Sequence, residues 1–243
     1  MRPRLVATGL LALALAACTP AAPRDAAAVE ALGMQAAQTR DAGALRTLQH
    51  WAGAAPAPLN ALAARELGLA LAADPAQADQ ARRWLTQAAS AGDAEAAWTL
   101  GDAQRRGGLG WTPDPAAARP WFERAAAAEH PAALLALARA ARNGEAQPRD
   151  PVAALALLQR ASRAGSAQAM YLLSQAYAQG EGTAPDLALA RHWLEQAAER
   201  HHPPAMQDWA LALEDGRLGV TRDAEAAREQ WREAGEERRN RWR

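Results

Sequence analysis

The chain has 243 residues, with 27 basic and 27 acidic side chains, no formal net charge and a single cysteine. The balanced charge argues against nucleic acid as a partner, because binding to a phosphate backbone needs an excess of basic side chains. One cysteine excludes an internal disulfide and a cysteine-ligated zinc site. Half of the residues are hydrophobic, most of them alanine, and this composition favours a helical protein.

The first segment is a candidate export signal. Arg2 and Arg4 precede an uncharged, apolar run from Leu5 to Ala17, and Cys18 follows. A run of 13 residues is too short to span a bilayer and has the length of a signal-peptide core. The sequence Leu15-Ala16-Ala17-Cys18 resembles the bacterial lipobox. An ordinary signal peptide with an incidental cysteine is the alternative.

The lipobox resemblance implies a lipoprotein of the bacterial envelope. Residues 1–17 would be the signal peptide, Cys18 would carry the lipid anchor, and residues 18–25 would form a short tether containing Pro20 and Pro23. Thr19, rather than aspartate, follows the cysteine. By resemblance to enterobacterial sorting, this residue indicates the outer membrane, with the domain facing the periplasm.

The remaining chain is dominated by an internal repeat. Bulky apolar residues recur at intervals of 36 to 38 residues, at Trp84, Trp121, Leu157, Trp193 and Trp231. A fixed period of this size is typical of a solenoid. We expect these anchor residues, and Trp51 before them, to be buried in the core.

Other columns at constant distance from the anchor predict two helices in each unit. Positions 12, 16, 19 and 23 residues after the anchor are apolar or small and share one helical face. The last of these positions is always glycine, as a left-handed helix cap requires, at Gly107, Gly144, Gly180 and Gly216. An aspartate then provides an N-cap for the second helix, at Asp114, Asp150, Asp186 and Asp223.

These columns match a known family. The clearest unit contains Ala169, Leu173, Gly180-Glu181-Gly182, Asp186, Trp193 and Ala197-Ala198, and it resembles the Sel1-like repeat, a relative of the tetratricopeptide repeat. The resemblance covers residues 61–231 and implies an all-α solenoid of stacked antiparallel helix pairs, with a period of about 36 residues. Ala146 replaces the second glycine of one turn, and Leu157 replaces an anchor tryptophan.

The ends of the repeat array depart from this pattern. Residues 26–60 contain a divergent copy of the repeat that lacks the glycine turn. We expect them to form a divergent N-terminal helical cap. Pro56 and Pro58 mark the loop that follows. Residues 232–243 interleave arginine and glutamate, and they predict a charged extension of the last helix.

The candidate binding surface is the face of each first helix that points away from the packing stripe. The resemblance implies that these helices line the concave side of the solenoid. The face combines aromatic, arginine, amide and aliphatic side chains: Trp98, Asp102, Arg105, Leu135, Arg139, Arg142, Tyr171, Gln175, Gln207, Leu211 and Glu214. Tryptophan, tyrosine and arginine dominate protein interfaces. The alternative is that these side chains only solvate the groove or pack between units.

No residue pattern predicts catalysis, a cofactor or a metal. Of the five histidines only His201 and His202 are adjacent, and they fall in an interhelix loop without a carboxylate or cysteine column beside them. Serine, histidine and acidic residues are not in a nucleophile-elbow context. The sequence therefore predicts a protein that is not an enzyme.

These observations predict a membrane-anchored scaffold or adaptor of the bacterial envelope. Its concave face would bind one or more envelope proteins. Similarity to Sel1-like lipoproteins implies a setting such as a secretion or exopolysaccharide assembly. The alternative is a glycan- or peptidoglycan-binding module that uses the groove aromatics Trp98 and Tyr171.

Overall fold

The computed structural model describes residues 20–240, which form twelve α-helices and two 3-10 turns, with no β-strand among them. The first half contains α1 (Ala26–Thr39), α2 (Ala42–Ala54), α3 (Leu59–Ala72), η1 (Pro75–Gln77), α4 (Ala78–Ser90), α5 (Ala94–Arg106) and α6 (Pro115–Ala127). The second half contains α7 (Pro131–Asn143), α8 (Pro151–Arg163), α9 (Ala167–Gln179), α10 (Leu187–Glu199), α11 (Pro203–Asp215), η2 (Arg217–Gly219) and α12 (Ala224–Asn240). The all-α prediction is confirmed.

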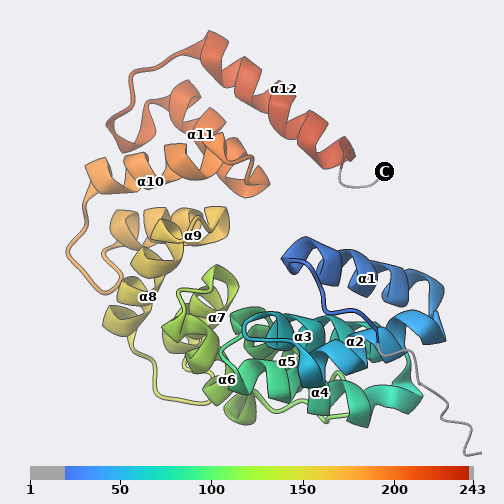
Figure 1. Cartoon of the computed structure of the whole chain (residues 1–243). Coiled ribbons are helices and arrows are strands. Elements are labelled where there is room, and N and C mark those ends of the chain that lie inside the picture. The colour runs from blue at the N-terminus through green and yellow to red at the C-terminus, as the bar shows by residue number, and fades with distance from the viewer. Residues whose placement is uncertain (1–19, 241–243) are drawn as a thin grey trace, which may run out of the picture.

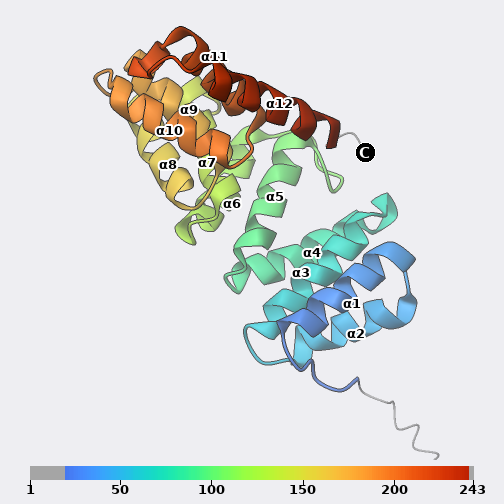
Figure 2. The ribbon, with the colours of Figure 1, turned by 90° about the horizontal axis from the view of Figure 1, so that it is seen from above.

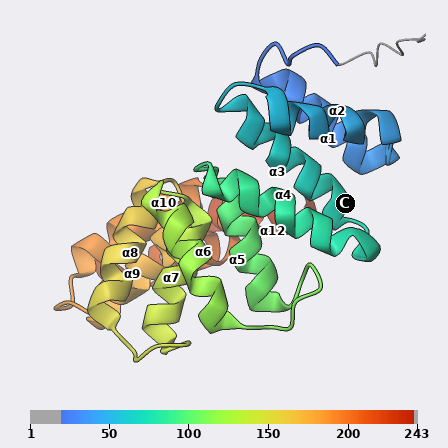
Figure 3. The same cartoon turned by 60° about the horizontal axis from the view of Figure 1, so that its bottom comes forward.

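The helices stack as antiparallel pairs. Each odd-numbered helix from α3 onward packs most extensively on the even-numbered helix that follows it, and each pair then packs on the next. The stack follows an arc from α1 to α12 (Figure 1). Figure 2 places α1 and α2 at one end of the stack and α11 and α12 at the other, and Figure 3 shows α1 and α2 as an end layer next to α3. The predicted solenoid is therefore confirmed.

The capping residues explain where the paired helices begin and end. The side chains of Asp114, Asp150 and Asp186 accept hydrogen bonds from backbone N–H groups in the first turns of α6, α8 and α10. Asp223 does the same for α12. At the other end, the predicted glycines cap α5, α7, α9 and α11 in the left-handed conformation, at Gly107, Gly144, Gly180 and Gly216. Both sets of predicted caps are confirmed.

A second left-handed residue follows each capping glycine by two positions. These residues are Leu109, Ala146, Gly182 and Leu218. At Gly182 the backbone of the preceding pair comes close, because a Cβ there would lie 2.3 Å from the carbonyl oxygen of Pro151. Glycine at this position lets the turn approach α8 closely.

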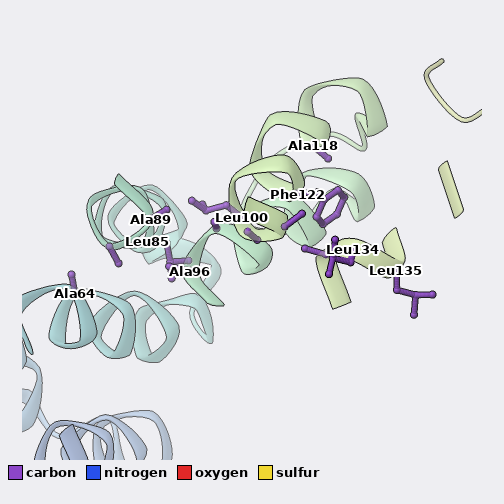
Figure 4. Close-up of a cluster of buried hydrophobic side chains, with 14 of the residues drawn as sticks. Ala64, Leu85, Ala89, Ala96, Leu100, Ala118, Phe122, Leu134 and Leu135 are labelled. Carbon is purple, nitrogen blue, oxygen red and sulfur yellow. The ribbon is translucent and has the colours of Figure 1, made fainter. Parts of the chain in front are cut away.

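The core lies between the helices of each pair and between neighbouring pairs. Its largest buried side chains include Leu85, Leu100, Leu134 and Leu173, separated by many buried alanines. Figure 4 shows Leu100, Phe122 and Leu134 converging between helices. The alanines allow close approach of the backbones, and the leucines supply apolar area.

The anchor tryptophans are not at the centre of this core. Trp84, Trp121 and Trp193 are only partly buried and pack against its edge, whereas the residue after each anchor is buried, at Leu85, Phe122 and Leu194. The indole N–H groups face polar partners: Trp121 Nε1 donates to Gln104 Oε1 at 3.1 Å, and Trp231 Nε1 donates to Glu214 Oε1 at 3.3 Å. The expectation that the anchors are buried is therefore only partly met: the rings pack on the core from its edge, because the N–H groups of Trp121 and Trp231 bond to side chains of the preceding helix.

The first helix pair is attached differently from the others. Both α1 and α2 pack more on α3 than on each other. Gly33 allows close contact, since a Cβ there would lie 2.3 Å from the Glu66 carboxylate. Arg65 of α3 pairs with Glu30 of α1, with Glu66, and with Asp93, the N-cap of α5. Charge and close packing thus join three helices here.

The proposed lipidation residue Cys18 and the signal peptide lie outside the described residues, as do the last three residues of the chain. Within residues 20–240, none of the helices has the length and hydropathy needed to cross a membrane.

Candidate functional site

The middle of the arc has α7 and α9 on its inner side, facing the space that the arc encloses, whereas α6 and α8 lie behind them on the outer edge (Figure 1). The predicted binding residues are on α5, α7, α9 and α11. They gather mainly in two separate hollows, one between α5 and α7 and one between α9 and α11.

The α5/α7 hollow, with a cavity volume of about 230 Å³, contains five of the predicted residues. These are Trp98, Asp102, Arg105, Leu135 and Arg139. Phe122 of α6 and Gln168 of α9 complete its wall, with Arg106 and Glu145 at its margin. The hollow therefore combines an apolar floor with charged groups.

Trp98 packs against His130, a residue that the sequence pattern did not single out. The indole stacks on the His130 ring, with centroids 5.7 Å apart and planes inclined by 23°. His130 is the N-cap of α7, where its Nδ1 accepts from Ala133 N–H at 3.3 Å. Its Nε2 lies 3.0 Å from Glu95 Oε2 and donates to it, because Nδ1 serves as the acceptor. One face of Trp98 is thus covered.

The charged groups of the α5/α7 hollow are unevenly paired. Asp102 Oδ1 accepts from Arg105 Nη2 at 2.8 Å and from Arg106 Nε at 3.0 Å. Arg139 is exposed, and it has no ion pair or hydrogen bond to any other side chain within residues 20–240. Leu135, which was expected to be open to the groove, is only 8 % exposed, because its side chain packs into the core cluster.

The α9/α11 hollow contains Tyr171 and Gln175, together with Gln179, Asp208 and Arg217. Tyr171 OH donates to Asp208 Oδ2 at 2.8 Å, and its ring lies 5.3 Å from the His202 ring at 47°. Partial burial, followed by the interaction with Asp208, raises the pKa of Tyr171 to about 12. The phenol therefore stays neutral to a higher pH than an exposed tyrosine does.

The other predicted residues lie outside these hollows. Arg142 Nε pairs with Glu181 Oε2 at 2.7 Å, and Arg149 binds the other oxygen of the same carboxylate at 2.6 Å. Gln207 and Leu211 are half-buried on α11, and Glu214 accepts the Trp231 N–H. Arg142 thus takes part in an ion-paired contact between the turns of two consecutive repeats, at the side of a separate hollow that Asn143 and Gln179 also line.

Sequence reasoning missed Arg106, His130, Glu145 and Asp208. Arg106 could have been found, because it lies one turn beyond Asp102 and continues the same helical stripe. His130 and Glu145 approach from a cap and a turn, so helical periodicity carries no signal for them. Among residues 20–240, no group of three or more histidine, cysteine or acidic side chains is placed to hold a metal ion.

Comparison with known proteins agrees with this architecture. A family model described as "Sel1 repeat" matches five consecutive segments, residues 61–93, 94–130, 131–166, 167–202 and 203–236. Each segment corresponds to one helix pair, from α3/α4 to α11/α12. None of the curated proteins compared with the chain matches it.

Two solved structures have the same fold. A Sel1 repeat protein from Oxalobacter formigenes is 25 % identical, with a TM-score of 0.74, and the match covers 87 % of this chain and 88 % of that one. The protein c5321, described as a protective antigen of uropathogenic Escherichia coli with an SLR fold, is 22 % identical, with a TM-score of 0.71. That match covers 87 % of this chain and 46 % of c5321, and at this identity it establishes the fold alone.

Proposed function

Because the chain belongs to the Sel1 repeat family, whose members are generally protein-interaction scaffolds, we propose that it is a non-enzymatic scaffold or adaptor of the bacterial envelope. The partner would be an envelope protein bound on the inner face of the arc. The observation that carries this proposal is the α5/α7 hollow, where Trp98, Phe122 and three arginines surround one recess. Aromatic and arginine side chains around a desolvated centre are typical of interface hot spots.

The proposed location rests on the sequence of the first 18 residues. A short apolar run ending in Leu15-Ala16-Ala17-Cys18 is typical of a lipoprotein signal, and Thr19 favours the outer membrane. A lipid anchor would hold the solenoid at the periplasmic face of the membrane. A secretion or exopolysaccharide assembly is the setting that we propose for such an adaptor.

Site-specific photo-crosslinking in cells tests whether the inner face binds a protein. A photoreactive amino acid at the exposed position Gln179, which borders the α9/α11 hollow, is compared with the same residue at Val152 of α8 on the outer side. We expect a discrete crosslinked protein from position 179 and none from position 152. Equal crosslinking from both positions, or none from either, would contradict the proposal.

Glycan or peptidoglycan binding is the alternative, and the aromatic side chains of the two hollows are its only support. Carbohydrate stacking requires an accessible ring face. His130 covers one face of Trp98, and the hydroxyl of Tyr171 is bound to Asp208. Recovery of cell-wall or exopolysaccharide fragments with the purified chain, in place of a protein, would favour this alternative.

A further inference from the structure

We propose that the α5/α7 hollow recognises an acidic peptide segment, in which an aspartate or glutamate lies next to an apolar side chain. This inference rests on the proposed function, because it gives the chemistry of the partner segment that the inner face would bind. Three features of the hollow support it: an apolar floor, an excess of guanidinium groups and a difference from the α9/α11 hollow.

The floor of the hollow can bury one apolar side chain. Trp98 supplies the accessible aromatic surface, Phe122, which is 5 % exposed, closes the base of the hollow, and Ala132 and Ala136 of α7 leave room above the backbone. His130 fixes the orientation of the indole through stacking at 5.7 Å. A preorganised aromatic surface loses little conformational entropy when a partner binds to it. The apolar residue of the peptide is assigned to this surface.

The rim of the hollow has a net positive charge. Arg105, Arg106 and Arg139 supply three positive charges, whereas Asp102 and Glu145 supply two negative charges, which leaves one positive charge. Each guanidinium has five N–H donors. Arg105 and Arg106 each direct one donor at Asp102 Oδ1, and no acceptor within residues 20–240 binds Arg139. Donors are therefore free to bind a carboxylate in the bidentate geometry that guanidinium groups favour.

The α9/α11 hollow lacks this excess charge. Its carboxylate, Asp208, already accepts from Tyr171, and Arg217 pairs with Asp215. One positive and one negative side chain line it, so its net charge is zero. Charge complementarity directs an acidic residue of the partner to the α5/α7 hollow, which fixes the register and direction of a bound segment along the arc.

Selection from a displayed library of random 12-residue peptides tests this assignment. The purified full-length chain is compared with Arg139→Gln and with Arg163→Gln. Arg163 is the matched control, because it is also an exposed arginine without a partner in the described part of the chain, but it lies on α8 at the outer side. Melting temperatures of the three proteins establish that the fold is unchanged.

We expect peptides selected by the unmodified chain and by Arg163→Gln to be enriched in an acidic residue beside an aromatic or aliphatic one. Their affinity for Arg139→Gln should be about tenfold lower than for the unmodified chain, because one charge-assisted hydrogen-bonded pair is lost. Raised salt should reduce this difference in affinity between the two proteins. Peptides that bind without acidic enrichment, or bind Arg139→Gln equally well, would overturn the inference and leave the scaffold proposal standing. Failure to select any peptide would also overturn the inference, and crosslinking from position 179 then decides the scaffold proposal separately.

Discussion

Each turn between paired helices from α5 onward requires a left-handed backbone two residues after the capping glycine. Ala146 has this conformation at φ +56°, although its Cβ disfavours it, whereas Gly182 occupies the equivalent position without that cost. We therefore expect Ala146→Gly to raise the free energy of unfolding by about 0.5–1 kcal/mol, measured by urea denaturation.

Gly182→Ala is the control for this turn prediction, and it should change stability in the opposite direction. Its new Cβ would meet the carbonyl oxygen of Pro151 at 2.3 Å, so either the turn or α8 must move. If Ala146→Gly lowered the free energy of unfolding, the left-handed conformation of Ala146 would not be what reduces the stability of this repeat.

Tyr171 links the α9/α11 hollow to stability at high pH. Its pKa is raised from 10.0 to about 12, chiefly by burial and then by Asp208, so folding favours the neutral phenol. A raised folded-state pKa gives stability that is complete below pH 10 and is lost as the pH rises from 10 to 12. We expect Tyr171→Phe to flatten this part of the pH dependence of the melting temperature. An unchanged slope would mean that other groups cause the loss.

At the scale of the helix, sequence periodicity identified the repeat and its caps but not which neighbour is buried. Asp186 and Gly180 mark helix ends through local backbone chemistry, so the sequence alone predicts them. Trp84 and Leu85 recur together, and adjacent residues on a helix differ by about 100° in direction. Periodicity cannot decide which of these two side chains points between the helices. The larger side chain, Trp84, was expected to be buried, but Leu85 is the buried residue.

The sequence also predicted only part of the candidate binding surface, namely the residues that share one face of a helix. A helical stripe brought Trp98, Asp102 and Arg105 to one hollow, because all three lie on one face of α5. Arg142 continues the corresponding stripe of α7, but Glu181 from the following turn pairs with it. Contacts of this kind join residues of different repeats, and their geometry depends on how the repeats stack rather than on the period.

Substitutions in α4 test the corrected position of the core. Leu85 is fully buried, so Leu85→Ala should lower the free energy of unfolding by about 2–5 kcal/mol. Trp84 is only partly buried, and Trp84→Ala should cost about 1–2 kcal/mol, despite the greater size of its side chain. Chemical denaturation of the two variants gives the comparison. A larger loss for Trp84→Ala would restore the anchor tryptophans to the centre of the core.

At the scale of the whole molecule, Arg65 couples the first helix pair to the repeat array. Burial opposes the charge of this guanidinium, but Glu66, Asp93 and Glu30 outweigh that effect and raise its pKa. Arg65→Met would leave Glu66 and Asp93 without their shared cation, at an expected cost of about 1–3 kcal/mol.

Hydrogen exchange measures where the effect of Arg65→Met is felt. Repeat proteins are stabilised by nearest-neighbour contacts, so α1 and α2 should lose protection while α11 keeps it. Uniform loss of protection along the chain would instead indicate that the solenoid unfolds as one cooperative unit.

The last prediction concerns how the molecule is attached to its membrane. The Trp51 indole donates to the carbonyl oxygen of Ala21 at 2.7 Å, so the segment before α1 is docked on α2. Cys18 lies only three positions before Ala21, a reach of about 10 Å at full extension. If Cys18 carries acyl chains, as the lipobox-like sequence predicts, the helices must lie close to the bilayer surface.

Cys18→Ser should therefore release the protein from the membrane fraction, because each buried methylene of the lost chains contributes about 0.8 kcal/mol to anchoring. Fractionation with an alkaline wash is the measurement, and Thr19→Ser is the matched control that leaves the cysteine in place. A Cys18→Ser protein that stays in washed membranes would show that the solenoid is held there by something other than lipid. The contact between Ala21 and Trp51 would then no longer require the helices to lie close to the bilayer, because Cys18 would not be the point of attachment.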